Sequence, residues 1–455
     1  MDSERQENGF PRRERKNNKL KHMTQAYLPP LMILLAAIGL ILIVVGAIRG
    51  GKNNEAEAGA NASNPSATLD QTQQQALDAG RRLMDEASRR AAQYDYDGAL
   101  SLLNSFSGDP SSIEGMTEAI SDYTAAKNAL VPWGDNESIP HLSFQPLVAD
   151  PDRAFDNDEN ADSYRSYNFT VAQFTAILQQ LYDNGYVLVS MHDVALPLTD
   201  SNGGTSFASS SIMLPEGKKP LILSEVPVNF YLDTVDSDDD GIADAGGDGF
   251  ASRLVLDSSG RVTAEMVTAS GETVQGAFDV VPVLDAFIES HPSFSYRGAK
   301  AILGVTGYDG VLGYRGSSST AEAQAVAQAL LADGYSFASF SYGRVPYGSV
   351  SLEEIQADLA DWEAKVLPIT GPVDTLFYVS GSDLADIGTP YSGDDFGALY
   401  TAGFRYFVGM GSSPWGSITS EYVRQTRTTV NPAKLSDSPG QFMDYFKAAE
   451  ILSAA

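Results

Sequence analysis

The sequence predicts an α/β fold: a distorted (β/α) barrel, preceded by a transmembrane helix and a small helical segment. From Ile139 onward, short apolar runs of strand character alternate with helices, the order that builds a mostly parallel sheet covered by helices. Residues 31–48 form an uncharged apolar run that precedes this region. The chain has 455 residues, 43% of them hydrophobic, enough for one domain of about 250 to 300 residues and a smaller one.

The net charge of −29 is unevenly distributed along the chain. Residues 1–26 carry seven Lys and Arg against four Asp and Glu, a net +3, so the remainder carries −32. An acidic body of this kind repels phosphate backbones, which makes nucleic acid an unfavourable partner. Cysteine is absent, which excludes disulfides, thiolate nucleophiles and cysteine-ligated zinc.

The apolar run from Leu31 to Ile48 is long enough to span the hydrocarbon core of a bilayer as a helix. The basic residues before it place the N-terminus in the cytoplasm and the acidic body outside the cell, anchored in the cell membrane by a single pass. A cleaved signal peptide with a cleavage site in 55–60 is the alternative, but the apolar run exceeds the usual signal core. We therefore predict a basic tail (1–26), a transmembrane helix (27–48) and a flexible linker (49–68).

Residues 69–130 are predicted to be helical, in three segments with apolar residues spaced three and four apart. The middle segment, "YDYDGALSLL", is similar to the first helix of a tetratricopeptide-type hairpin. One or two such units do not bury their faces alone. The segment is therefore predicted to be either a stalk or lid packed on the next domain, which is favoured, or a peptide-binding array.

Residues 139–455 are predicted to form the barrel domain, with helix boundaries set by capping residues. "YVLVSMHDV" is predicted to be a strand that presents His192 at its end. The predicted helices are those capped by Thr170 and by Ser351 with Glu354, those near 279–291, 320–331 and 394–404, and one C-terminal helix over 439–452. In such barrels the chemistry gathers at the carboxyl ends of the strands.

Several segments in this order resemble the polysaccharide deacetylase family, carbohydrate esterase family 4, in a membrane-anchored bacterial branch. They are "PLILSEVPVNFY", "GDGFASRLVLDSSGRV", "FSYRGAKAILGVTGYDGVLGYRG", "DGYSFASFSYGRV" and "LEEIQADLADWEAKVLPITGPVDTLFYVSGSD". The resemblance implies a distorted (β/α) barrel that removes acetyl groups from N-acetylated glycans, with a divalent metal that activates water. It also implies that an envelope polysaccharide or peptidoglycan is the partner.

The residues at the family's catalytic positions differ from its pattern. Ser224 matches the first position of the Thr/Ser-Phe-Asp-Asp motif, but Glu225 stands for the phenylalanine, and Val226 and Pro227 replace the two aspartates. In "ASFSYGR", Phe340 and Arg344 occupy the positions of the two metal-binding histidines. The four replacements of aspartate and histidine offer no metal ligand, so no zinc is expected and the deacetylase site is predicted to be degenerate.

The histidines support the same expectation without reference to a family. Those beyond the predicted membrane segment are His141, His192 and His291, and no two histidines are four residues apart. His-based zinc sites usually draw ligands from near neighbours in sequence. A structural role is therefore favoured for each of the three.

Two further groups of residues are candidates at the barrel mouth. Glu225 is predicted either to act as a base or, as favoured, to form an ion pair with Arg344 in the vacated metal position. Three tyrosines and an aspartate are candidates for glycan binding, although tyrosines at strand ends are more often half-buried core. These are Tyr335, Tyr342, Tyr378 and Asp383.

The acidic stretch "DTVDSDDDGIADAGGDG" is a candidate calcium loop. Its alternating carboxylates around Gly241 suit an oxygen shell, but the twelfth position is Gly247 instead of the bidentate glutamate of an EF-hand. A solvated acidic loop without metal is the favoured alternative. The candidate ligands are Asp236, Asp238, Asp240 and Asp244.

Three functions follow from the sequence. The favoured one is a deacetylase-like pseudoenzyme, displayed outside the cell, that binds envelope glycan or a protein partner. An active deacetylase with unusual ligands such as Glu225, Asp309 and Asp383 is the enzymatic alternative. The third is an envelope scaffold that docks proteins through its helical segment.

Overall fold

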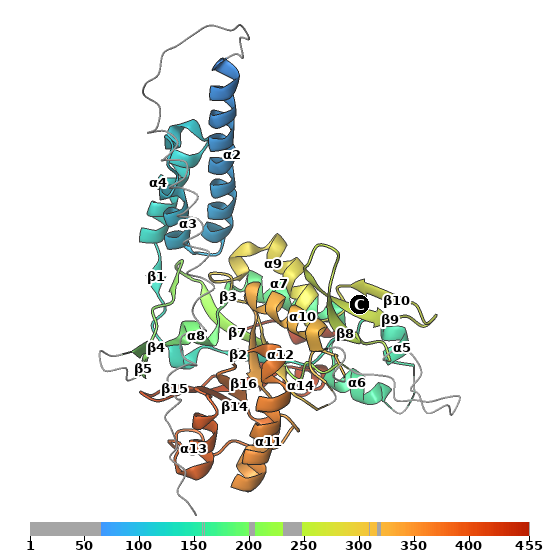
Figure 1. Ribbon diagram of the computed structural model, residues 1–455. Helices are drawn as coiled ribbons and strands as arrows, with labels where there is room; N and C mark the ends of the chain where they lie inside the picture. The colour runs from blue at the N-terminus through green and yellow to red at the C-terminus, as the bar shows by residue number, and fades with distance from the viewer. Residues whose placement is uncertain are drawn as a thin grey trace, which may run out of the picture. The chain divides into compact units, whose positions relative to one another are not determined.

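The computed structural model describes residues 65–156, 158, 160–199, 205–230, 248–308, 310–315 and 320–454, with the backbone alone at 65–72 and 205 (Figure 1). The chain divides into two compact units, Met1–Leu69 and Asp70–Ala455. Within the described residues, no helix is both long and apolar enough to cross a membrane. The predicted membrane helix at 31–48, the acidic loop with Asp236, Asp238, Asp240 and Asp244, and Asp309 lie outside the described residues.

Seven parallel strands close a barrel, because the pairing that starts at β11 returns to it through β7. Around the barrel they are β11 (Ile302–Val305), β12 (Ser336–Ser339), β13 (Thr375–Phe377), β14 (Tyr406–Met410), β16 (Val423–Thr429), β2 (His141–Phe144) and β7 (Lys219–Glu225). On one edge, β7 pairs with two different strands. Its first residues, 219–221, pair with β3 (Tyr186–Leu188), and its last two, Ser224 and Glu225, pair with β11. The predicted (β/α) barrel is therefore observed.

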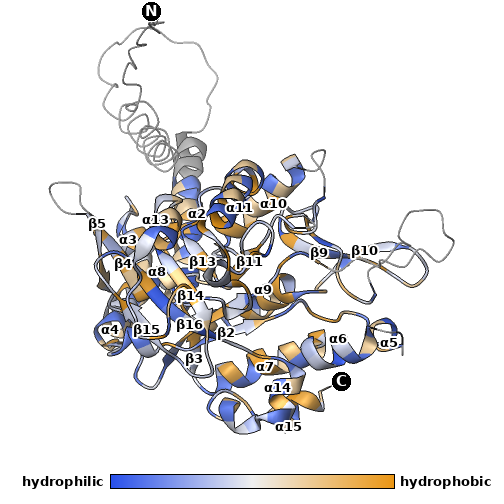
Figure 2. Ribbon diagram, turned by 90° about the horizontal axis from the view of Figure 1, so that it is seen from below, coloured by the Kyte–Doolittle hydropathy of each residue, from blue (hydrophilic) through white to orange (hydrophobic). Residues whose placement is uncertain are grey.

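Successive side chains along each strand point alternately into the barrel and out toward the covering helices, which gives the sheet an inner and an outer face. Inward-facing residues include Ile222, Ala338, Phe377 and Val408, which share one buried cluster. Leu221 and Leu223 belong to a second, larger cluster between the strands and the covering helices. In Figure 2 the covering helices α7 (Val171–Asp183) and α9 (Val280–Ser290) carry hydrophobic stretches that account for this outer layer.

The other elements complete this framework. The remaining helices of the barrel domain are α5 (Pro151–Ala154), α6 (Ala161–Tyr167), α8 (Met191–Val194), α10 (Thr320–Ala332), α11 (Leu352–Lys365), α12 (Leu367–Thr370), α13 (Gly393–Thr401), α14 (Pro432–Asp437) and α15 (Ala448–Leu452). The remaining strands are β1 (Val131–Pro132), β4 (Ala195–Thr199), β5 (Thr205–Ser209), β6 (Met213–Leu214), β8 (Arg253–Leu256), β9 (Val262–Val267), β10 (Thr273–Gly276) and β15 (Gly416–Ile418). Short 3-10 helices are η1 (Pro110–Ser112), η2 (Asn136–Ser138), η3 (Pro292–Phe294), η5 (Tyr347–Ser349), η6 (Val379–Gly381) and η7 (Pro439–Phe442).

The segment predicted to be helical over 69–130 contains α2 (Pro65–Ala92), α3 (Tyr96–Asn104) and α4 (Met116–Asn128). Their apolar faces form a core of their own, which includes Ala87, Leu103 and Met116. The segment also contacts the barrel domain, since the hydroxyl of Tyr94 donates a hydrogen bond to the carbonyl oxygen of Ser293 over 3.0 Å. It therefore belongs to the same compact unit as the barrel.

Two sequence-based boundaries were wrong. The C-terminal helix predicted over 439–452 is broken into η7 and α15, because the backbone N–H of Lys447 donates to the side-chain oxygen of Gln180 instead of continuing a helix. His192 does not end a strand: Ser190 and Asp193 form a capping box that starts the short helix α8. The capping boxes predicted at Thr170 and at Ser351 are both observed, the latter with Glu354.

Candidate functional site

Side chains from β13, β16 and the residue after β12 fill the barrel interior near its carboxyl end. Arg427 on β16 is buried, and its guanidinium carbon lies 4.9 Å from the ring centre of Phe377 and 5.8 Å from that of Phe340. It donates hydrogen bonds to the carbonyl oxygens of Val408 (3.0 Å) and Tyr378 (3.2 Å). Burial lowers the pKa of Arg427 to about 10, which still leaves the side chain charged at neutral pH.

Val226, where the family resemblance implies a catalytic aspartate, is also packed. A Cβ at Gly304 would lie 2.9 Å from one methyl group of Val226 and 3.1 Å from the ring of Phe377, so only glycine fits between them. Val226 and Phe340 are each 7% exposed and belong to the inner cluster. Apolar groups and one guanidinium therefore occupy this part of the barrel.

His141 is a structural histidine inside the barrel. Its Nε2 lies 2.8 Å from the hydroxyl of Ser224, and its Nδ1 lies 3.3 Å from the side-chain oxygen of Gln425. Burial, followed by the charge of Arg427, lowers the pKa of His141 to about 3, so the ring is neutral. Because Gln425 offers an oxygen, Nδ1 carries the proton and Nε2 accepts from Ser224.

The residues at the mouth do not fit the divalent metal that the family resemblance implies. Val226, Pro227 and Phe340 provide no ligand atom, and both nitrogens of His141 are committed to hydrogen bonds. The guanidinium of Arg427 adds a buried positive charge that would repel a cation. Across the described ranges, no three His, Asp or Glu side chains are grouped closely enough to hold a metal ion.

Glu225 lies outside the barrel interior and pairs with Asp279, the N-cap residue of α9. It shares the outer face of β7 with Leu221 and Leu223, and both carboxyl groups are fully buried. If both groups were ionised, both carboxylate oxygens of Glu225 and Oδ2 of Asp279 would be buried without a hydrogen-bond donor. If Glu225 keeps its proton, its hydroxyl can donate to the carboxylate of Asp279. Burial and then the charge of Asp279 raise the pKa of Glu225 well above its usual range, and burial raises that of Asp279 to about 6.

The predicted ion pair between Glu225 and Arg344 is wrong. Glu225 is turned toward α9, while Arg344 is exposed and has no ion pair with any residue that the structure describes. The backbone of Arg344 is left-handed, with a φ of 58°, as is that of Ser341 at 55°. Non-glycine residues in this conformation are uncommon and persist where the surroundings enforce it.

Asp358 on α11 enforces the conformation of this loop. Its buried carboxylate accepts hydrogen bonds from the backbone N–H groups of Tyr342 (2.8 Å) and Gly343 (2.7 Å), and from the hydroxyl of Tyr347 (2.5 Å). The loop between β12 and α11 is therefore fixed from within the domain, and Arg344 projects to solvent.

A polar cavity of about 490 Å³ lies beyond the carboxyl ends of β13 and β14, next to Arg424 and Thr426 on β16. We call it the carboxyl-end cavity. Side chains that line it include Ser349, Ser382, Asp383, Asp386, Met410 and Trp415. The hydroxyls of Ser349 and Ser382 lie 2.5 Å apart, and the exposed carboxylate of Asp386 forms no ion pair within the described part of the chain. The cavity therefore combines hydroxyl groups, one free carboxylate and a partly exposed indole ring.

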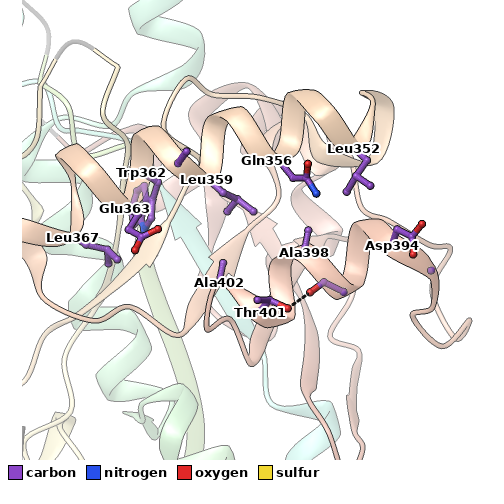
Figure 3. Close-up of a pocket in the computed structure, with 13 residues that line it drawn as sticks. Leu352, Gln356, Leu359, Trp362, Glu363, Leu367, Asp394, Ala398, Thr401 and Ala402 are labelled. Atoms are coloured by element: carbon purple, nitrogen blue, oxygen red, sulfur yellow. Dashed lines mark hydrogen bonds between the residues drawn. The ribbon is translucent and has the colours of Figure 1, made fainter. Parts of the chain in front are cut away.

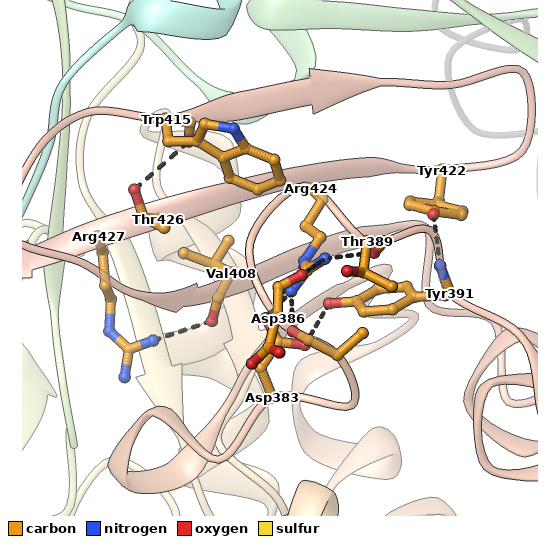
Figure 4. Close-up of polar contacts among 11 residues, drawn as sticks. Asp383, Asp386, Thr389, Tyr391, Val408, Trp415, Tyr422, Arg424, Thr426 and Arg427 are labelled. Carbon is orange, nitrogen blue, oxygen red and sulfur yellow. Dashed lines mark hydrogen bonds and ion pairs between the residues drawn. The ribbon is translucent and has the colours of Figure 1, made fainter.

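Arg424 on β16 holds the loop that forms one wall of this cavity (Figure 4). Its Nε and Nη2 donate to Oδ2 of Asp383 over 3.2 and 2.9 Å, and Asp383 also accepts from the hydroxyl of Tyr391 over 2.5 Å. Nη1 donates to the carbonyl oxygens of Asp386 (3.1 Å) and Thr389 (2.9 Å). Nη2 makes a further bond to the carbonyl of the residue before Asp386.

All five N–H groups of Arg424 are thereby used, so it has no donor left for a ligand. Its guanidinium also lies 4.5 Å from the ring centre of Tyr391. Arg424 and Asp383 therefore shape the cavity wall and leave ligand contacts to neighbouring groups.

The structure separates the four residues predicted to bind glycan. Asp383 lines the carboxyl-end cavity. Tyr378 is 1% exposed and belongs to the outer cluster. Tyr335 precedes β12, and its buried hydroxyl lies 2.9 Å from the carbonyl oxygen of Val281 and 2.7 Å from the carboxylate of Asp285. Neither ring can stack on a sugar, because each is enclosed by the core. Tyr342 is partly exposed, with the amine of Lys365 4.4 Å from its ring centre.

Sequence reasoning missed β16, which supplies Arg424, Gln425 and Arg427. "VRQTRTT" carries too many polar residues to be predicted as a central buried strand, yet all its residues except the last are buried. The three threonines and one valine among its seven residues were the available signal for this strand.

The chain was compared with protein-family models, curated proteins and solved structures. No family model matches the chain, and no curated protein is detectably similar to it. A search of solved structures found the Streptococcus pyogenes deacetylase PplD in complex with acetate, with 13% identity and a TM-score of 0.34. The match covers 69% of this chain and 99% of the streptococcal chain. A likeness this weak carries no argument, and the barrel is established by its strand pairing alone.

Proposed function

We propose that this chain is a deacetylase-like barrel protein of the cell envelope that binds carbohydrate at the carboxyl-end cavity without metal-dependent hydrolysis. The observation that carries the proposal is the cavity itself. It places Ser349, Ser382 and the carboxylate of Asp386 near the ring of Trp415. Hydroxyl and carboxylate groups bind sugar hydroxyls, and an aromatic ring packs against the apolar face of a pyranose.

The packing of the barrel interior supports binding over catalysis. Deacetylation of an amide requires stabilisation of the negative charge that develops on the carbonyl oxygen, usually the largest contribution to the rate. Arg427 carries a positive charge but is enclosed by Phe340 and Phe377 and donates to backbone carbonyls. Glu225, the candidate base that the sequence suggests, is buried against Asp279 on the outer face of β7.

The enzymatic alternative with Glu225, Asp309 and Asp383 as ligands is not favoured. Glu225 lies under α9, and Asp383 is committed to Arg424 and Tyr391. The third function, docking through the helical segment, is also less favoured, because much of the apolar surface of α2, α3 and α4 is used in their own core. Membrane anchoring and display outside the cell remain part of the proposal through the apolar run at 31–48.

The proposal is tested by measuring how N-acetylglucosamine oligosaccharides bind to the full-length chain, alongside acetate release and the content of zinc, cobalt and nickel. Trp415→Ala and Asp386→Asn are expected to weaken binding by about tenfold, the loss of one ring contact or hydrogen bond. Trp133→Ala, a partly exposed tryptophan that does not line the cavity, is the matched control. Acetate release with stoichiometric metal would overturn the proposal, as would glycan binding that both cavity variants leave unchanged.

A further inference from the structure

A second hollow of about 750 Å³ lies between α11 and α13 (Figure 3). We call it the α11–α13 groove. On the α11 side it is lined by Leu352, Gln356, Leu359 and Glu363, spaced four, three and four residues apart. This spacing places all four on one stripe of the helix, beside the inward stripe that buries Ile355 and Asp358. Trp362, also buried, borders the groove as well. Leu352 and Leu359 on this stripe remain partly exposed, so α11 presents two leucines that the barrel covers only in part.

The opposite wall is made of small residues from α13 and the turn after it. Gly397, Ala398 and Ala402 line the groove, and a Cβ added at Gly397 would meet no atom within 4 Å. Small side chains leave space for the backbone of another element to approach closely. Leu359 and Ala398 remain partly exposed at the centre of the groove.

Each end of the groove carries a carboxylate. Figure 3 shows Asp394 near Leu352 at one end and Glu363 near Leu367 at the other. Both carboxylates are exposed, and neither forms an ion pair with a residue in the described ranges. From 352 to 363 the rise along α11 is about 16 Å, or three helical turns.

We propose that the α11–α13 groove binds one amphipathic helix of a protein partner. The helix presents leucine-like side chains to Leu359 and Ala398, and a Lys or Arg near each end pairs with Asp394 and Glu363. Leu352 and Leu359 supply apolar contact, the small residues of α13 admit a helix backbone, and the carboxylates at the two ends select basic residues about 11 residues apart. An anionic membrane surface is excluded as the occupant because the same carboxylates repel it.

The test uses a fluorescent peptide of about 18 residues, long enough for several helical turns, with a leucine stripe and two lysines about 11 residues apart. Binding to the full-length chain is followed by anisotropy at physiological salt. Ala398→Trp, which fills the groove, and Glu363→Lys are expected to weaken binding by about tenfold or more. Ala357→Trp on a different face of α11 and Glu118→Lys on α4, which makes the same charge change, are the controls and stay within about twofold.

Three results would overturn the inference. If Glu118→Lys and Glu363→Lys weaken binding equally, the peptide is attracted by the overall negative charge of the protein and does not bind in the groove. Equal binding of a peptide with the same composition but scrambled order would exclude an amphipathic helix. Self-association of the chain that Ala398→Trp abolishes would assign the groove to a second copy. If Ala398→Trp does not fold by circular dichroism, the two charge variants decide alone.

Discussion

At the scale of single residues, the defining feature is the burial of ionisable groups against aromatic rings or against one another. The guanidinium of Arg427 is stacked on two rings inside the barrel, and the carboxyl groups of Glu225 and Asp279 share a proton outside it. A buried charge is tolerated when hydrogen bonds or a neighbouring ring compensate for its lost hydration. These residues stabilise a fixed arrangement, and the Glu225–Asp279 pair makes stability depend on pH.

The pair predicts that stability falls as the pH rises. The folded-state pKa of Asp279, about 6, exceeds its ordinary value of 3.8, and that of Glu225 is also raised. The folded protein then binds more protons than the unfolded chain above about pH 4, so stability is lost as the pH rises through 6. Glu225→Gln keeps a donor for Asp279 without titrating and is expected to stabilise the protein at pH 8, on the order of 1 to 3 kcal/mol.

Urea unfolding at pH 5 and pH 8 measures this effect. The variant Glu225→Gln should lose less stability than the wild type between the two values. Glu289→Gln, an exposed glutamate on the same helix as Asp279, is the control and should leave the wild-type pH dependence in place. Parallel curves for the wild type and Glu225→Gln would contradict a shared proton at this position.

At the scale of elements, the loops at the carboxyl ends of the strands are fixed by single buried side chains. Asp358 binds the loop after β12 through two backbone N–H groups, and Arg424 binds the loop after β13 through three backbone carbonyls. Non-glycine residues with left-handed backbone occur in both loops, at Ser341, Arg344 and Ser380. The carboxyl-end cavity is therefore a rigid feature of the fold.

Asp383→Asn is expected to destabilise the protein by about 3 kcal/mol, because it leaves the buried charge of Arg424 without its counterion. Asp386→Asn, on the same loop but exposed, changes the free energy of unfolding by less than about 0.5 kcal/mol. Urea denaturation at pH 7 compares the two. Equal stability of both variants would show that Arg424 does not depend on Asp383.

At the scale of the whole molecule, the barrel and the three-helix segment form one compact unit, and the first 69 residues form another. The segment joins the barrel through Tyr94, which is 6% exposed and bonded to Ser293, and through the backbone of Arg297, which donates to Gln93. These contacts favour a stalk or lid, as the sequence predicts, over a freestanding peptide-binding array.

A chain that begins at Pro65 is therefore expected to unfold in the same cooperative transition as the full-length chain. Differential scanning calorimetry of the two chains measures this, with the midpoints within a few degrees of each other. A fragment that melts without a cooperative transition would contradict the division into two units.

The sequence by itself determined the alternation of strands and helices, the capping boxes at Thr170 and Ser351, and the absence of metal ligands at Val226 and Phe340. These depend on local periodicity, on side chains close to the backbone they cap, and on the chemistry of single residue types. It did not reveal β16, whose Arg424 and Arg427 bond to Asp383 and Tyr378, 41 and 49 residues away along the chain.

Only the tertiary structure decided which way each side chain faces. Glu225 lies outside the barrel and Arg427 inside it, Tyr335 and Tyr378 are buried, and the carboxyl-end cavity forms at a different set of strand ends from the motif positions. The physical reason is that adjacent residues on a strand face opposite sides of the sheet, and that long-range pairing sets which side is enclosed.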